Sequence, residues 1–140
     1  MKTFIKLLLS GAIIILALNK SAYSKEKIKI GLIVPLSGEN SAIGEKIIKS
    51  IRMAVNKIDD EKIEILPRDT KSNPINALKV SKELYQEGVR IIIGPVFNES
   101  SKYLDDLKDI TFISFTNKLI GNPKNVISAG VNAISQIQTI

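Results

Sequence analysis

The stretch IKIGLIVPLSGENSAIG at residues 28–44 contains the features from which the fold can be predicted. Its first part, 28–35, is almost wholly apolar and rich in β-branched residues, as expected of a strand buried on both faces of a sheet. Pro35 ends this run, and a polar loop follows at 36–44. Apolar residues then recur at positions 43, 47, 48, 51, 55 and 58. This spacing places them on one stripe of an amphipathic helix.

The rest of the chain repeats this alternation of apolar runs and helical patterns. A second strand is predicted at 63–66, and because Pro67 ends it, an edge position in the sheet suits it best. Asn73 and Pro74 indicate the N-cap and first residue of a second helix, which ends before Gly88. The remaining predicted elements are a strand at 89–93, a weaker helix at 100–107 and strands at 110–114 and 126–128. This order predicts an α/β fold, a parallel sheet with right-handed crossovers and helices on both faces.

Residues 1–24 have the three parts of a secretory signal peptide. Two lysines precede an apolar run at 7–18, and the small-x-small sequence AYS follows at 22–24. The alternative is an uncleaved membrane anchor, but a run of this length rises only about 18 Å as a helix, short of the roughly 30 Å of a hydrocarbon core. We therefore expect cleavage after residue 24 and a mature chain, 25–140, that does not span the membrane and lies in the periplasm.

Composition excludes several classes of function. The chain has no cysteine and no histidine, so thiol nucleophiles, Ser-His-Asp triads and zinc fingers cannot form within it. We expect no metal site and no cofactor. The net charge is +6, and without the three lysines of 1–24 it is +3. Because this surplus is small and aromatic residues are only 5% of the chain, nucleic-acid binding is not indicated.

The loops that follow the strands hold the first candidate site residues, because ligands of open parallel sheets bind outside the carboxyl ends of the strands. The first loop offers Ser37 and Gly38, where backbone amides can approach an anionic group beside a helix N-terminus. A plain turn with Ser41 as the helix cap is an equally good interpretation. Asp69, after the second strand, is expected to accept hydrogen bonds from loop amides rather than to contact a ligand.

The most promising loops follow the third and fourth strands. They carry amide and hydroxyl side chains that can donate to a carboxylate, with two phenylalanines as apolar walls. The candidates are Phe97, Asn98, Phe115, Thr116, Asn117 and Lys118. Asn98 can instead cap the helix at 100–107, and the sequence does not decide between the two roles.

Six short motifs occur in an order that resembles a known family. They are KIGLIVPLSG at 29–38 with Gly44, the amphipathic helix, LPRDT at 66–70, NPxxA at 73–77, IIIGP at 91–95 and ISFTN at 113–117. Together they resemble the type I periplasmic binding proteins of the leucine/isoleucine/valine-binding branch, over residues 27–130. The resemblance implies a doubly wound parallel sheet of strand order 2-1-3-4-5. It also identifies 25–140 as a partial N-terminal lobe, with the second lobe absent.

The resemblance implies a function as well. Members of this family trap a small solute between two lobes and deliver it to an ABC permease, without catalysis. An amino acid or a similar small polar solute is the implied ligand. The positions that match the family's ligand contacts are Asn98, Thr116 with Lys118, and Ile43. Of these, Asn98 can donate to a carboxylate and Lys118 can pair with one.

Two alternatives stay open. Similar stretches occur in penicillin-binding protein activators, which use this fold in the periplasm to regulate peptidoglycan synthases. Neighbouring genes distinguish the two functions, since an ABC permease and ATPase favour transport and cell-wall genes favour the activator. A flavodoxin-like enzyme is more remote, because the glycine spacing of the first loop matches neither a dinucleotide fingerprint nor a P-loop.

Overall fold

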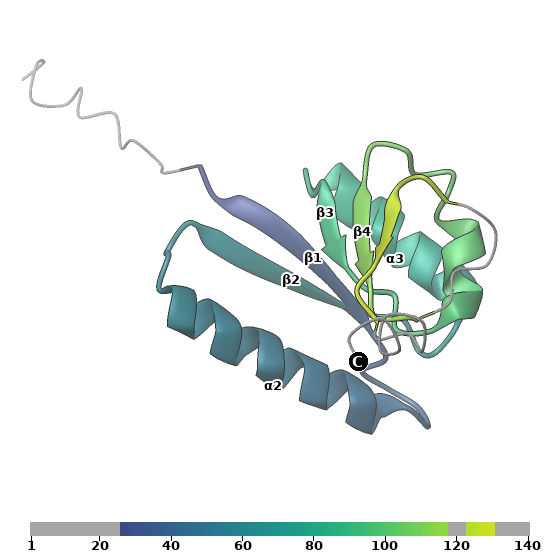
Figure 1. The fold of residues 1–140 in the computed structure, drawn as a ribbon, viewed down its shortest axis with the longest axis horizontal. Coiled ribbons are helices and arrows are strands. Elements are labelled where there is room, and N and C mark those ends of the chain that lie inside the picture. The colour runs from purple at the N-terminus through teal and green to yellow at the C-terminus, as the bar shows by residue number, and fades with distance from the viewer. Residues whose placement is uncertain (1–25, 118–122, 131–140) are drawn as a thin grey trace, which may run out of the picture.

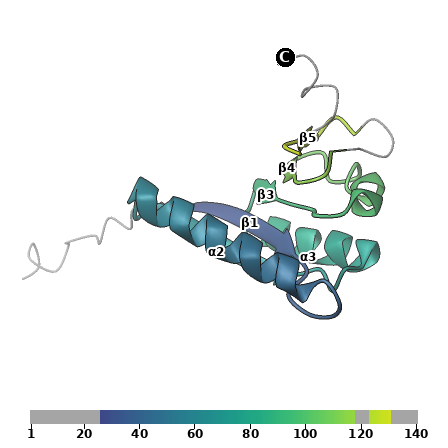
Figure 2. The ribbon, with the colours of Figure 1, turned by 60° about the horizontal axis from the view of Figure 1, so that its bottom comes forward.

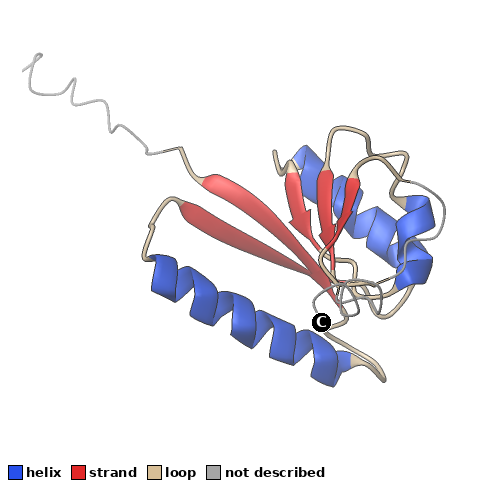
Figure 3. Cartoon of the chain, viewed as in Figure 1, coloured by secondary structure: helices blue, strands red, loops and turns tan. Residues whose placement is uncertain are grey.

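The computed structural model describes residues 26–117 and 123–130 of the chain, and Figure 1 shows them as one twisted sheet with its helices. The strands are β1 (Ile28–Val34), β2 (Ile63–Asp69), β3 (Ile91–Ile93), β4 (Thr111–Ser114) and β5 (Val126–Ser128). The helices are α2 (Ser41–Ile58), α3 (Pro74–Gln86) and the short 3₁₀ helix η1 (Asn98–Tyr103), and Figure 3 shows how they alternate with the strands. The predicted signal peptide and Lys118 lie outside the described residues.

All five strands pair in parallel, in the order β2-β1-β3-β4-β5. This confirms the predicted doubly wound order 2-1-3-4-5. The chain first crosses from β1 to the β2 edge, and then returns across β3 and β4 to the β5 edge. Right-handed crossovers in opposite directions place their helices on opposite faces. Figure 2 accordingly shows α2 on one side of β1 and α3 on the other.

The hydrophobic core lies between the sheet and α3. From the helix, Ala77, Val80 and Leu84 are buried, and they belong to one cluster with residues of four strands. The strand residues of this cluster are Ile33, Ile92, Phe112 and Val126, and the connecting segments add Val89, Leu104 and Ile110. Because side chains alternate along a strand, these positions define the α3 face of the sheet.

The apolar stripe of α2 is only half-buried, although its spacing predicts a core-facing helix. Ile47 and Ile51 are partly exposed, and Ile58 at the end of the helix is 60% exposed. Gly44 is the one fully buried residue of α2. A Cβ at this position would run into the carbonyl group of Pro35, so the absent side chain lets the first turn of α2 pack directly against the end of β1.

The predicted end of the second strand at residue 66 is wrong, because β2 continues through Pro67 to Asp69. The amide of Ile28 donates to the carbonyl of Lys62 at 2.7 Å, and the amide of Thr70 donates to the carbonyl of Val34 at 3.0 Å. The even-numbered residues of β2 therefore bond to β1, and the nitrogen of Pro67 faces the open edge, where the ladder needs no donor. The predicted edge position of this strand is confirmed.

The helix predicted at 100–107 is also wrong, since the segment forms the 3₁₀ helix η1 at Asn98–Tyr103. The hydroxyl of Ser101 donates to the carbonyl of Asn98 at 2.7 Å. Serine side chains that bond the backbone in this way compete with the α-helical pattern. The amide of Leu104 donates to the carbonyl of Ser101, three residues back, at 3.1 Å, which is the tighter pattern that suits short helical segments.

Candidate functional site

A hollow of about 450 Å³ lies at the carboxyl ends of β3 and β4. Its described lining comes from two loops that are distant in sequence and adjacent in the sheet, because β3 pairs with β4. The lining residues are Val96, Phe97, Asn98, Glu99, Phe115, Thr116 and Asn117. This is the place where open parallel sheets bind ligands, and a volume of this size suits a small molecule.

Ser114, at the end of β4, fixes the two loops against each other. Its buried hydroxyl donates to the carbonyl of Pro95 at 3.0 Å and accepts from the amide of Thr116 at 3.2 Å. The amide of Phe115 donates to the same Pro95 carbonyl at 3.2 Å. Ser114 is not among the candidate site residues predicted from the sequence. The sequence feature that could have identified Ser114 is a hydroxyl in the last position of a buried strand. Its hydrogen-bond partners are not evident from the sequence alone.

The end of β5 supports this hollow from the next position in the sheet. The hydroxyl of Ser128 donates to the carbonyl of Thr116 at 2.5 Å, and the amide of Ala129 donates to the carbonyl of Ser114 at 2.8 Å. A Cβ at Gly130 would lie 2.5 Å from the carbonyl carbon of Thr116. Only glycine allows the chain to pass this closely over the loop, so three strand ends together determine the shape of the hollow.

The side chains at the hollow combine apolar rings with amides. Phe97 and Phe115 are half-buried, and Asn98 and Asn117 supply groups that both donate and accept. The alternative role of Asn98 as a cap is wrong, because the N-cap of η1 is Phe97 and no side chain caps this helix. Glu99 supplies the one charged group among the described lining residues. The hollow can therefore hold a small molecule with an apolar body and several hydrogen-bonding groups.

The loop between β1 and α2 follows the strand next to β3, because β1 pairs with β3. It therefore neighbours the loop after β3 that lines the hollow. Ser37 and Gly38 are exposed here, and Gly38 has a φ of 82°. The interpretation of Ser41 as the helix cap is wrong, since the N-cap of α2 is Asn40 and its side chain makes no capping bond. The Asn40 amide instead donates to the hydroxyl of Ser72 at 3.1 Å, in the loop after β2.

The carboxylate of Asp69 accepts hydrogen bonds from this loop, as the sequence analysis expects. Partial burial acts to raise the pKa of Asp69. Donation from the Ser37 hydroxyl and from the amides of Lys71, Leu36 and Ser37 outweighs burial and holds the pKa below its ordinary value of 3.8. The carboxylate is therefore a charged anchor for the loop above it.

The structure brings together five of the nine candidate site residues. Phe97, Asn98, Phe115, Thr116 and Asn117 line the hollow, and Ser37 and Gly38 lie in the neighbouring loop. Ile43 is 42% exposed on the first turn of α2 and is not among the described lining residues. Val96 and Glu99 also line the hollow and are not among the candidate residues. They belong to the loop after the third strand, from which Phe97 and Asn98 were predicted.

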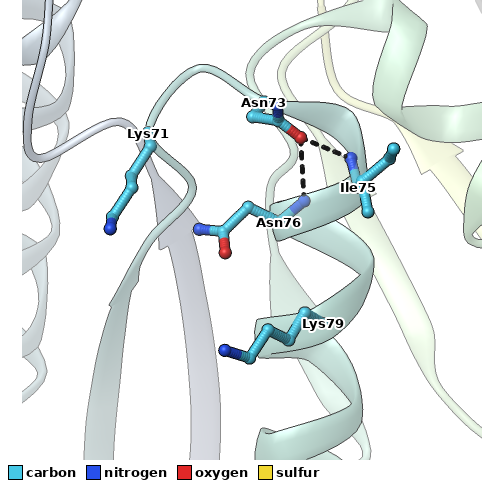
Figure 4. A pocket seen from close by; sticks show the side chains of 5 residues that line it. All are labelled: Lys71, Asn73, Ile75, Asn76 and Lys79. Carbon is cyan, nitrogen blue, oxygen red and sulfur yellow. Dashed lines mark hydrogen bonds between the residues drawn. The ribbon is translucent and has the colours of Figure 1, made fainter.

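A second hollow, of about 440 Å³, lies at the N-terminus of α3. Figure 4 shows the side chains of Lys71 and Lys79 on either side of Asn76. The amides of Ile75 and Asn76 are occupied, because the side chain of Asn73 accepts from both, at 2.8 and 3.0 Å. The helix N-terminus is therefore capped by its own chain, as the sequence predicts.

Over 26–117 and 123–130, no group of three or more histidine, cysteine, aspartate or glutamate residues lies in a position to hold a metal ion. Within the same ranges, no helix has both the length and the apolar character needed to cross a membrane.

Known proteins resemble this chain in sequence. A family model described as periplasmic binding protein matches residues 27–140. The Leu/Ile/Val-binding protein homolog 1 of Brucella abortus (strain 2308) is 30% identical over 97 residues. The match covers 64% of this chain and 26% of that protein, so the chain spans about a quarter of the length of this relative.

Solved structures resemble it in fold. The solute binding protein of an ABC transporter from Rhodopseudomonas palustris BisB5, in complex with 3,4-dihydroxybenzoic acid, has a TM-score of 0.60 at 26% identity. The match covers 64% of this chain and 27% of that one. The leucine binding protein LivK of Thermotoga maritima MSB8 has a TM-score of 0.59 at 23% identity, with coverage of 71% and 31%. The second likeness shows the fold alone.

Proposed function

This chain belongs to the periplasmic binding protein family, whose model matches residues 27–140, and we propose on that basis that it is part of the solute-binding protein of an ABC transporter. The observation that carries the proposal is the hollow at the carboxyl ends of β3 and β4. Residues from both loops line it, and Ser114 holds the loops together. The site captures a solute without chemical change, so the protein is not an enzyme.

The lining favours small solutes that combine an apolar body with a carboxylate. Phe97 and Phe115 suit the apolar body, while the side-chain amides of Asn98 and Asn117 supply donors. Lys118 remains the proposed partner of the ligand carboxylate. The names of the similar proteins support this class, since one is a Leu/Ile/Val-binding protein homolog and another holds 3,4-dihydroxybenzoic acid. We propose amino acids first and aromatic acids second.

The proposed location and partner follow from the family and from the N-terminal sequence. The signal peptide predicted at 1–24 directs the mature chain to the periplasm, where binding proteins of this family meet an ABC permease. The alternative of a penicillin-binding protein activator stays a prediction, and neighbouring cell-wall genes in place of transporter genes favour it. The flavodoxin-like enzyme is not proposed further.

The proposal is tested by titrating the isotope-labelled chain with L-leucine and with 3,4-dihydroxybenzoate and recording the backbone amide signals by NMR. This method also detects weak binding. We expect saturable changes in the amide signals of Asn98, Thr116 and Asn117. In Asn98→Ala the affinity obtained from the remaining signals should fall about tenfold, because one hydrogen bond to the ligand is lost.

The matched control for this titration is Asn56→Ala, which removes an exposed amide from the far side of the molecule, on α2. The control should bind as the parent does. Changes spread evenly over the surface, or equal affinity in Asn98→Ala and the parent, would contradict the assignment of the hollow.

A further inference from the structure

The carboxylate of Asp69 joins the two loops that follow β1 and β2. Its Oδ1 accepts from the amide of Leu36 at 2.8 Å, from the amide of Ser37 at 3.3 Å and from the amide of Lys71 at 2.8 Å. Its Oδ2 accepts from the hydroxyl of Ser37 at 2.6 Å. A single side chain therefore binds three groups of the β1–α2 loop and one of its own turn.

The turn that carries Asp69 is itself tightly held. Lys71 and Ser72 are consecutive non-glycine residues with φ of 51° and 53°, a conformation that is uncommon for such residues. The side-chain Nδ2 of Asn76 donates to the carbonyl of Asp69 at 2.8 Å, and the side-chain amide of Asn40, in the other loop, donates to the hydroxyl of Ser72 at 3.1 Å. The bond from Asn40 to Ser72 and the bonds to the Asp69 carboxylate thus connect the two loops, which form one unit at the end of the sheet.

This arrangement changes what Ser37 can offer to a ligand. Because its hydroxyl hydrogen is directed to Asp69, the oxygen presents lone pairs and no free hydrogen. A neighbouring carboxylate also makes that oxygen a better acceptor, since hydrogen bonds in such a chain polarise one another. Ser37 is therefore suited to meet an ammonium, amide or hydroxyl group and not a carboxylate.

We propose that Asp69 is a positioning residue, which holds the β1–α2 loop as one wall of the ligand crevice and presents Ser37 as an acceptor for an N–H or O–H group of the solute. The inference rests on the proposed function, because it assumes that the crevice beside β1 and β3 binds a solute. It assigns the two ends of the solute to different loops. The donor group faces Ser37, and the carboxylate faces the loops after β3 and β4.

Amide hydrogen exchange tests the positioning role without any ligand. In Asp69→Asn, the amides of Leu36 and Ser37 should exchange about tenfold faster than in the parent, because a neutral amide accepts more weakly than a carboxylate. The core amide of Ile92 should stay strongly protected, which shows that the fold is intact. The control Asp105→Asn removes an exposed carboxylate elsewhere. Equal exchange of the loop amides in parent and Asp69→Asn would overturn the proposal.

A second measurement compares L-leucine with 4-methylpentanoate, which has the same carbon chain and carboxylate but no ammonium group. Leucine should change the Ser37 amide signal in the parent, whereas 4-methylpentanoate should change only Asn98, Thr116 and Asn117. In Asp69→Asn the response of Ser37 to leucine should fall several-fold while the other three persist. Equal responses of Ser37 to both probes would overturn the acceptor role. No response to either probe would overturn the proposed function, while the exchange result would still decide whether Asp69 holds the loop.

Discussion

Asp69 makes the stability of the chain sensitive to acid. Its pKa in the folded state lies below the ordinary value of 3.8, so the ionised form stabilises the fold fully above the unfolded pKa. This contribution is lost as the pH falls through the folded pKa. We expect Asp69→Asn to lower the free energy of unfolding by about 1 kcal/mol at pH 7, a figure reduced for the partial exposure of the group.

The measurement is urea unfolding of parent and variant at pH 7 and at pH 3 and below. The difference between the two proteins should shrink steadily below about pH 4, because the parent then loses its charge as well. Asp105→Asn serves as the exposed control and should show little difference at either pH. A difference between parent and Asp69→Asn that stays constant with pH would contradict the role of the ionised carboxylate.

Gly44 is a second residue whose identity the fold requires. A methyl group there would collide with the carbonyl of Pro35, which is backbone and cannot turn away. Alanine normally stabilises a helix relative to glycine by up to about 1 kcal/mol. Here we expect Gly44→Ala to destabilise the chain by about 2 kcal/mol, because the first turn of α2 must move off β1. Thermal unfolding checks this, with Ser50→Ala on the exposed face of the same helix as the control. A higher Tm for Gly44→Ala would refute the close packing.

At the scale of elements, α3 and α2 contribute unequally to the core. Leu84 of α3 is fully buried among residues of the central cluster, whereas Ile51 of α2 is only half-buried. We expect Leu84→Ala to cost about 3 to 4 kcal/mol of unfolding free energy, through lost burial and the cavity that remains. Ile51→Ala should cost about 1 kcal/mol, because less surface is involved. Chemical denaturation of the two variants measures this ratio, and equal losses would mean that α2 packs as deeply as α3.

The same elements show how far the sequence determines the structure. Apolar runs and turn residues predict the five strands and the start of α3 at Asn73, because these features act locally, whereas the order of the strands in the sheet was implied by the family resemblance. The end of β2 was misjudged, since the tolerance of Pro67 depends on which way its nitrogen points, and this follows only from the pairing with β1. For the same reason the sequence selects the residues around the hollow but not Ser114, whose partners come from another strand end.

At the scale of the whole molecule, the described residues leave one face of β3, β4 and β5 open. Phe112 and Ile92 point toward α3, so the alternate residues Ile91, Ile113 and Ile127 point to the opposite side. Ile91 is 41% exposed and Ile127 is 57% exposed. Figure 2 shows α2 beside β1, and in the described part of the chain no helix lies over β3, β4 and β5 on that side. An apolar strip of this kind, on adjacent strands, promotes association.

We therefore expect the isolated chain to self-associate as its concentration rises, and the double variant Ile91→Lys/Ile127→Lys to stay monomeric, because ammonium groups on this face oppose its burial. Sedimentation velocity over a hundredfold range of concentration measures the effect. Ile75→Lys is the matched control, since Ile75 is 67% exposed at the start of α3, away from the open face. Association that Ile75→Lys suppresses equally well would assign it to general apolar exposure. Association of the parent that only the double variant abolishes would assign it to the uncovered strands.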